Sequence, residues 1–280
     1  MLMSPNSPHS FADLIRRSDY DRYLSALFAP AGPRAHLFAL YAFNFEIAKT
    51  AETVSQGPLG LIRLQWWREA IDELYSGNVR QHEVLLALAR AVSAYDLPRA
   101  LFDAMIDARE ADLEETPFAT LEDLEAYADA TSGHVMRLSA RILGAGDKLD
   151  AVARDAGIAY ALTGLLRALP YRAARRNLPL PLDALLAEGM SHEDVFAGEV
   201  GSKLGPIIGP IAERASAHLQ AARVARIPRA ALPAFLPASL TPAYVRQMMR
   251  PGFNPFRDAT EIAPHRRQLV MLRAMVRGRL

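Results

Sequence analysis

Apolar residues recur every three or four positions along most of this chain, and this spacing constrains its fold more than any other feature. The pattern runs from Phe11 to the last residues, and it places apolar side chains on one face of a helix. Hydroxyl residues stand where helices would begin, with Ser10 before Phe11 and Thr120 three residues before Asp123. The sequence therefore predicts an all-α protein, broken mainly at prolines and glycines within residues 30–33, 57–58, 77, 98, 116–117, 144–146, 179–181, 228 and 251–252.

Length and composition limit how the chain can be organised into domains. Its 280 residues, 51% of them hydrophobic and 22% charged, suffice for one large core. We expect one domain over residues 1–280, with residues 1–10 flexible. No apolar run approaches the ~18 residues of a membrane-spanning helix, and residues 1–10 lack the apolar centre of a signal peptide. The absence of cysteine excludes disulfides and thiolate metal sites, and the histidine spacing does not predict a zinc site.

Two segments, Leu37–Glu52 and Asp155–Leu186, resemble the helices with which squalene and phytoene synthases bind prenyl diphosphates. In that family the first helix carries Asp-Asp-x-x-Asp and the second Asp-x-x-x-Asp, and these acids hold Mg²⁺. The resemblance implies a single-domain, isoprenoid (trans-prenyl diphosphate) synthase-like helical fold. It covers nearly the whole chain and includes residues 39–41, 63–67, 112–113, 124–127 and 180–183.

The acids of the family pattern are mostly replaced in this chain. The matched positions are Ala48, Lys49 and Glu52 in the first segment and Ala168 and Arg172 in the second. Their summed formal charge is +1, from two cations and one acid, where the family pattern gives −5. Mg²⁺ prefers oxygen ligands that include carboxylates, so we predict no catalytic residues, no metal and no cofactor. Mg²⁺ would be a cofactor only if the chain were a prenyltransferase.

The backbone conformation of proline gives a second argument against metal binding. Pro170 lies between Ala168 and Arg172 and disfavours helical geometry at the residue before it. We therefore expect the helix to end or kink at Leu169, which would separate the two matched positions.

Two apolar stripes and a run of arginines remain as binding candidates. Tyr41 and Phe45 belong to the first stripe, and Ala161 and Leu165 to the second. These stripes are either ordinary core or the walls of a metal-free tunnel for an isoprenoid or quinone lipid. Guanidinium groups suit phosphate, so the following arginines form either an anion site or a solvated loop: Arg167, Arg172, Arg175 and Arg176.

A closer resemblance is to the acid-depleted branch of the family, the factors that assist assembly of mitochondrial respiratory complex I. The shared stretches are residues 42–48, 166–171, 175–176 and 233–236. This resemblance implies a non-catalytic protein whose partners are complex I subunits or other assembly factors. The lack of a transit peptide suggests a bacterial protein, in the cytoplasm or peripheral on the inner face of the cytoplasmic membrane. Prenyl transfer and metal-free lipid binding remain as alternative functions.

The charge distribution marks the C-terminal residues as a candidate interface. Residues 1–140 carry 12 basic and 20 acidic residues, and residues 141–280 carry 20 basic and 11 acidic. We expect a basic helix over residues 264–280, with Leu269, Leu272, Val276 and Leu280 on one face and Arg266, Arg273 and Arg277 on another. It would rest on an anionic membrane or acidic partner, or dock on its own domain, with the acids of residues 103–115 as a counterpart. The split is not by itself a nucleic-acid signature.

A tryptophan pair supplies one further interface candidate. Leu64, Trp67, Ile71 and Leu74 form a core stripe, so Trp66 points to a neighbouring face. Trp66 is either a partner contact or partly buried against another helix.

Overall fold

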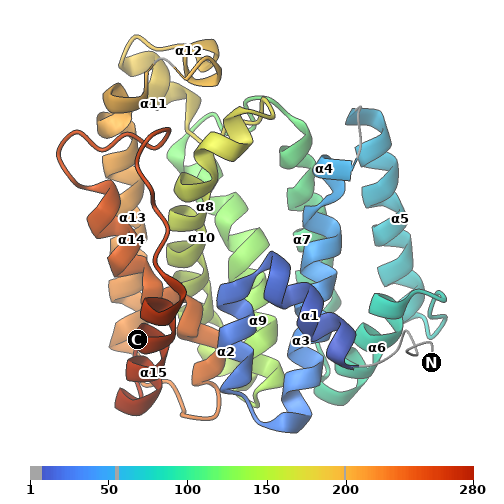
Figure 1. Cartoon of the computed structure of the whole chain (residues 1–280). Coiled ribbons are helices and arrows are strands. Elements are labelled where there is room, and N and C mark those ends of the chain that lie inside the picture. Colours follow the sequence, from blue (N-terminus) through green and yellow to red (C-terminus); the bar gives the residue numbers. More distant parts are fainter. Residues whose placement is uncertain (1–7, 54–56, 199) are drawn as a thin grey trace.

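The structure, a computed structural model, describes residues 8–53, 57–198 and 200–280, and within these ranges it is helical and contains no strand (Figure 1). The all-α prediction is confirmed. The longer helices are α3 (Ala31–Ala48), α5 (Gly57–Tyr75), α6 (Glu83–Tyr95), α10 (Asp150–Ala173), α13 (Gly205–Val224) and α15 (Pro264–Arg277). The shorter α-helices are α1 (Pro8–Ser18), α2 (Tyr20–Leu27), α4 (Thr50–Thr53), α7 (Arg99–Asp107), α8 (Leu121–Ala128), α9 (His134–Ile142), α11 (Leu182–Ala187), α12 (His192–Phe196) and α14 (Thr241–Met248).

Short turns of tighter or wider helix join these elements. The 3₁₀ segments are η1 (Ala108–Leu113), η3 (Gly146–Leu149), η4 (Gly201–Leu204) and η5 (Leu232–Leu240), and η2 (Asp129–Gly133) is a π-helical turn between α8 and α9. Such π turns often occur near functional sites. Here η2 packs directly against α10, the helix that carries the second matched motif.

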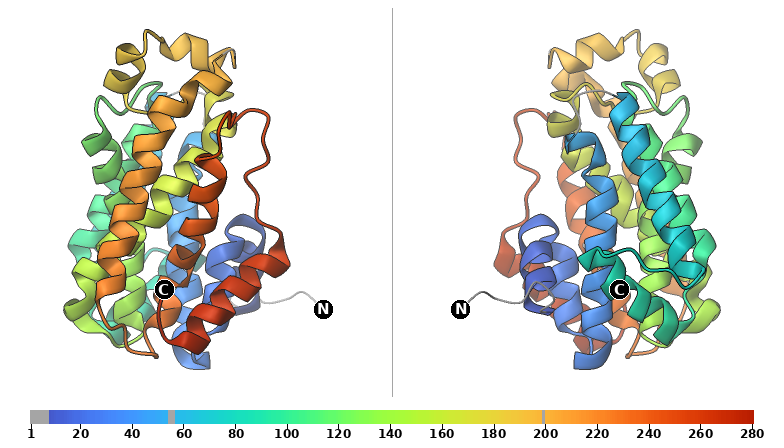
Figure 2. Two further views of the ribbon diagram at one scale, coloured as in Figure 1. Left: turned by 90° about the vertical axis from the view of Figure 1, so that its left-hand side faces the viewer. Right: turned by 90° about the vertical axis from the view of Figure 1, so that its right-hand side faces the viewer.

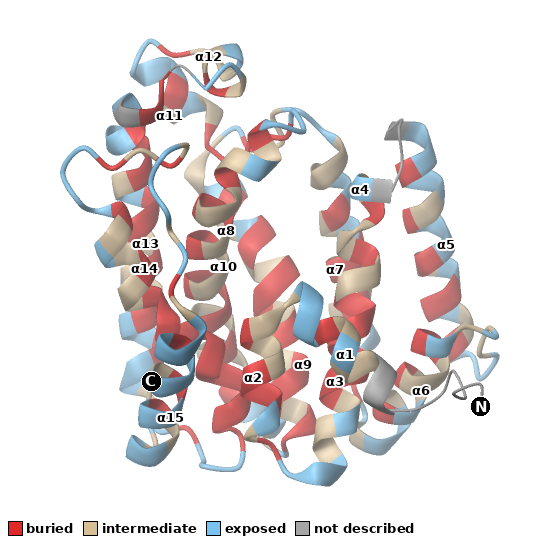
Figure 3. Ribbon diagram, in the orientation of Figure 1, coloured by how far each residue is buried: buried red, intermediate tan, exposed pale blue. Residues whose placement is uncertain are grey.

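The long helix α10 lies in the middle of the bundle. It packs against α13 on one side and against η2 and α9 on another, while α3 packs against α1, α6 and α9. The two views of Figure 2 show α13 and α15 on one side of the molecule and α5 and α6 on the opposite side. One continuous hydrophobic core runs from Ile15 to Ala274, and Figure 3 shows its buried residues concentrated on the inner faces of the helices.

Local sequence signals explain several helix ends. Thr120 and Asp123 form the expected capping box, in which each side chain accepts a hydrogen bond from the other residue's backbone N–H. The first helix begins at Pro8 rather than at Phe11, because proline is well suited to the first turn of a helix. The expected flexible segment 1–10 therefore overlaps α1, and residues 1–7 lie outside the described ranges.

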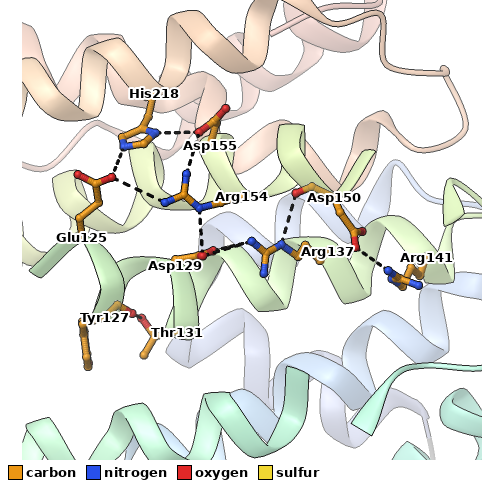
Figure 4. Close-up of polar contacts among 10 residues, drawn as sticks. All are labelled: Glu125, Tyr127, Asp129, Thr131, Arg137, Arg141, Asp150, Arg154, Asp155 and His218. Atoms are coloured by element: carbon orange, nitrogen blue, oxygen red, sulfur yellow. Dashed lines mark hydrogen bonds and ion pairs between the residues drawn. The ribbon is translucent and has the colours of Figure 1, made fainter. Parts of the chain in front are cut away.

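A close approach between backbones fixes α10 against η2. A Cβ atom on Gly157 would lie 2.4 Å from the Cα atom of Gly133, so this crossing requires glycine. Around it, charged side chains link α8, η2, α9, α10 and α13 (Figure 4). His218 joins two of these helices, with Nδ1 2.9 Å from Asp155 Oδ1 and Nε2 2.9 Å from Glu125 Oε1. The other members of the network are Asp129, Arg137, Arg141, Asp150 and Arg154.

No helix in the described ranges is both long enough and apolar enough to cross a bilayer.

Candidate functional site

Four of the five matched motif positions line one cavity of about 260 Å³, which we call the α4 cavity. Ala48 ends α3, Glu52 lies in α4, and Ala168 and Arg172 lie on α10. The remaining lining residues are Ala51, Arg109, Asp112, Tyr171, Arg175 and Asn177. Lys49 does not line this cavity, and its Nζ atom binds Glu46 Oε1 on the preceding turn. The fold thus brings four of the five matched positions together.

Arg172 is held in a buried ion cluster. Its Nη2 atom donates to Asp112 Oδ1 at 2.7 Å, and its Nε atom donates to Asn177 Oδ1 at 2.7 Å. Arg109 binds the other oxygen of Asp112 at 3.2 Å. The side chains of Asp112, Arg109 and Arg172 are 8%, 10% and 16% exposed. We call these three residues the Arg109–Asp112–Arg172 cluster.

The cluster carries a net charge of +1 and is completed by neutral partners. Tyr127 donates its hydroxyl to Asp112 Oδ1 at 2.7 Å, and Arg109 donates to Asn44 Oδ1 at 3.2 Å. Burial alone would raise the pKa of the Asp112 carboxyl, but Arg172 and Arg109 outweigh burial and hold that pKa below its usual value. The carboxylate therefore stays charged at neutral pH, with both of its oxygens engaged.

Arg109 and Arg172 also line a second cavity of about 450 Å³, the central cavity. Six arginines line it, against three acids, which gives a formal lining charge of +3. The arginines are Arg17, Arg22, Arg109, Arg167, Arg172 and Arg267, and the acids are Asp19, Asp21 and Glu261. Ala161, Gly164 and Leu165 form part of the α10 wall. The central cavity therefore has the charge of an anion site.

Most of these arginines already have acidic partners. Arg22 donates to Asp19 at 2.7 Å, and Arg267 donates to Asp21 at 3.2 Å. Burial raises the pKa of Asp21 above its usual range despite Arg267. Arg167 has no acidic partner among the described residues: its guanidinium stacks 4.1 Å from the Tyr244 ring centroid, and its buried Nε atom, like that of Arg109, has no hydrogen-bond partner there. Among the described residues, no carboxylate pairs with Arg167, so none competes directly with a phosphate for its guanidinium.

The arginine run after the second motif does not form one site. Arg167 faces the central cavity, Arg175 lines the α4 cavity, and Arg172 lines both. Arg176 lies outside both cavities and binds the exposed Glu115 and Glu193 at 2.8 and 2.6 Å. The stripe residues also separate: Ala161 and Leu165 reach the central cavity, whereas Tyr41 and Phe45 line neither one.

The expected helix end at Leu169 is wrong. Helix α10 continues through Pro170 to Ala173, because its packing against α13, η2 and α9 holds the helical geometry despite the lost backbone donor. Ala168 and Arg172 therefore keep their helical spacing.

The two interface candidates both reach the surface. Trp66 is 36% exposed, packs edge-on against Trp67 and His82, and lies 5.1 Å from the Arg80 guanidinium. Leu59, Leu61 and Ile62 are exposed on the same helix, α5. Arg266, Arg273 and Arg277 are exposed on α15.

Sequence reasoning did not find the partners of Arg172 and Arg109. Asp112 lies 60 residues away in η1, and Asn44 lies 65 residues from Arg109. The only signal was indirect, since Asp112-Leu113 and Leu124–Tyr127 belong to the stretches that carry the family resemblance.

A helical bundle with α3, α4 and α10 around these cavities defines the class of isoprenoid-synthase-like folds. The chain belongs to the squalene/phytoene synthase family, because the sequence profile of that family matches residues 15–273. The squalene synthase HpnC from Alicyclobacillus acidocaldarius superposes with a TM-score of 0.76 at 22% identity, covering 90% of this chain and 98% of that one. That likeness shows the fold.

Two curated relatives show the range of the family. NADH dehydrogenase (ubiquinone) complex I, assembly factor 6 of Bos taurus is 33% identical over 252 residues, which are 89% of this chain and 76% of the relative. Presqualene diphosphate synthase of Rhodopseudomonas palustris is 30% identical over 203 residues, which are 71% of this chain and 72% of the relative.

Proposed function

We propose that this chain is a non-catalytic member of the squalene/phytoene synthase family that assists the assembly of respiratory complex I. Its partners would be complex I subunits or other assembly factors, met in the cytoplasm or at the inner face of the cytoplasmic membrane. The likeness to assembly factor 6 of Bos taurus supports the role. The observation that carries the non-catalytic part is the ion pair of Arg172 with Asp112 at a matched acid position.

The residues around the α4 cavity do not fit a magnesium ion. Mg²⁺ needs oxygen ligands in octahedral geometry, normally with one or two carboxylates. Ala48 and Ala168 offer no side-chain oxygen, and both oxygens of Asp112 are engaged by arginines and Tyr127. Glu52 is the carboxylate left on the lining, and three arginines share that cavity with it. This electrostatic setting favours an anion over a divalent cation.

The first test separates assembly from prenyl transfer. In the native host, deletion of the gene should lower the amount of assembled complex I. The wild-type chain and Glu52→Gln should restore it equally, because no metal depends on Glu52. Glu188→Gln, which removes an exposed acid beyond α11, is the matched control. Failure of Glu52→Gln alone, or magnesium-dependent conversion of farnesyl or geranylgeranyl diphosphate by the purified chain, would overturn the proposal.

The central cavity favours a second function, metal-free binding of a phosphorylated isoprenoid. The lining charge of +3 supports it, as does the lack of an acidic partner for Arg167 among the described residues. Inorganic diphosphate with a chelator present should raise the melting temperature of the chain, since a ligand that binds only the folded state stabilises it. Arg167→Gln should abolish the shift, and Arg176→Gln, which changes an arginine outside both cavities, should retain it. Equal shifts in the two variants would refute this function.

Helix α5 is our proposed contact for a protein partner. Trp66 and Ile62 are exposed there together with Leu59, and aromatic side chains often anchor interfaces. Complex I assembly in the host should fall with Ile62→Ser/Trp66→Ser if this surface is used, and full assembly with that variant would exclude it.

A further inference from the structure

Helix α15 docks on the protein by a face that leaves its apolar stripe outside. The buried residues are Arg267, Met271 and Ala274, which pack toward η5 and α2. Arg267 donates to Asp21 at 3.2 Å and to the carbonyl of Ile262 at 2.7 Å. Leu269, Leu272 and Val276 are 44%, 48% and 68% exposed. Figure 3 shows the outward side of α15 as exposed.

A pocket lined by four arginines lies beside this stripe. Its volume is about 220 Å³, and it is formed where α15 and the following residues meet η5 and the end of α13. We call it the arginine pocket. Its lining consists of Arg223, Ser239, Val270, Arg273, Ala274, Arg277, Arg279 and Leu280, and it contains no acidic side chain. Val224, next to Arg223, is 90% exposed.

No acidic side chain in the described part of the chain neutralises these arginines. None of the four forms an ion pair with a residue in the described ranges. Acids that the sequence suggested as a counterpart form ion pairs elsewhere: Asp103 pairs with Arg99, Asp107 with Arg68, and Glu115 with Arg176. Burial, and then repulsion from Arg279, lower the pKa of Arg223. The pocket therefore concentrates positive charge that the fold itself does not use.

We infer that α15 and the arginine pocket form a docking site for the surface of an anionic phospholipid bilayer. Arginines hold phosphate by paired N–H donors, and a cluster with no acidic side chain in its lining is suited to lipid phosphates. Leu272 and Val276 lie on the same helix and would enter the interface between headgroups and acyl chains. This combination of exposed apolar and unpaired basic residues on one helix favours a bilayer over an acidic protein.

The inference does not depend on a role in complex I assembly, and its test needs only the purified full-length chain. The chain should float with vesicles that contain phosphatidylglycerol at low salt and should release as salt rises, because the attraction is screened. It should not float with pure phosphatidylcholine vesicles. Arg223→Gln/Arg273→Gln/Arg277→Gln should bind the anionic vesicles about a hundredfold more weakly, from roughly fivefold for each arginine.

A matched control removes the same charge from another surface. Arg246, Arg250 and Arg257 are exposed on or after α14, and their triple change to Gln should leave vesicle binding nearly as strong as in the wild type. Equal losses in the two triple variants would mean nonspecific attraction to the basic half of the chain and would overturn the inference. Absence of flotation for the wild type, or binding of an acidic peptide in its place, would also overturn it.

The apolar stripe gives an independent arm of the same experiment. Leu272→Ser/Val276→Ser should weaken flotation without changing the slope of its salt dependence, because these substitutions remove insertion and leave the charge. The melting temperature should stay close to that of the wild type, since both side chains are exposed. Unchanged flotation would show that α15 does not insert, and would refute this placement of the helix.

Discussion

Replacing Asp112 should lower the free energy of unfolding strongly with little change in the shape of the side chain. Asp112→Asn keeps the volume of the side chain and removes the charge that two buried arginines share. Arg172 would retain Asn177, and Arg109 would retain Asn44 and Tyr127, but neither would face an anion. Breaking a buried ion pair by removing one partner typically costs about 3–5 kcal/mol. This is a large share of the ~5–15 kcal/mol that stabilises an ordinary domain.

Equilibrium unfolding in urea, followed by circular dichroism, measures this loss. Glu115→Gln is the control, because it removes one carboxylate from an exposed pair with Arg176 and should leave the free energy of unfolding almost unchanged. Asp112→Asn/Arg172→Gln should be less destabilised than the sum of its single variants, since the two residues interact directly. A loss below about 1 kcal/mol for Asp112→Asn would refute the cluster as a source of stability.

The depressed pKa of Asp112 also sets the pH at which its contribution disappears. Because the carboxyl has a lower pKa in the folded chain than its usual 3.8, its stabilisation is present above that value and is lost as pH falls below it. Wild-type stability should therefore drop in strong acid more steeply than that of Asp112→Asn. Parallel acid profiles would contradict this assignment.

Two further predictions concern other parts of the fold. Gly157→Ala should destabilise the chain markedly, because its Cβ would meet the Gly133 backbone. Gly164→Ala on the same helix has nothing within 4 Å of its Cβ and should be neutral or stabilising by up to about 1 kcal/mol. Thermal melting of the two variants tests this difference. Burial, and then repulsion from Arg137, lower the pKa of His134 below 6.5. As the pH drops below about 6.5, the unfolded chain therefore binds a proton that the folded chain does not bind, and the free energy of unfolding should fall. His134→Gln should flatten that slope in urea unfolding, and an equally steep slope would contradict the assignment.

The sequence was sufficient to predict the fold class and to bring four of the five matched motif positions together. Helical periodicity predicted the all-α bundle, and the family resemblance placed Ala48, Glu52, Ala168 and Arg172 near one another. It could not predict the partner of Arg172, because a contact over 60 residues depends on how η1 packs against α10. No local pattern encodes such a contact.

Helix α15 shows a different limit of sequence reasoning. Its stripe of Leu269, Leu272 and Val276 is exposed, whereas Met271 and Ala274 are buried. The helix has apolar residues on two faces, so periodicity alone cannot choose between them. The choice follows from a tertiary contact, since Arg267 reaches Asp21 at the other end of the chain.

The Arg109–Asp112–Arg172 cluster has an evolutionary consequence. An aspartate introduced at position 172 would stand beside Asp112 in a buried setting, where two carboxylates repel strongly and Arg109 alone would compensate them. The single substitution Arg172→Asp would therefore lower the stability of the fold. The other members of the cluster would have to change at nearly the same time. Selection for stability would therefore oppose replacement of Arg172 by an acid unless the other members of the cluster changed with it.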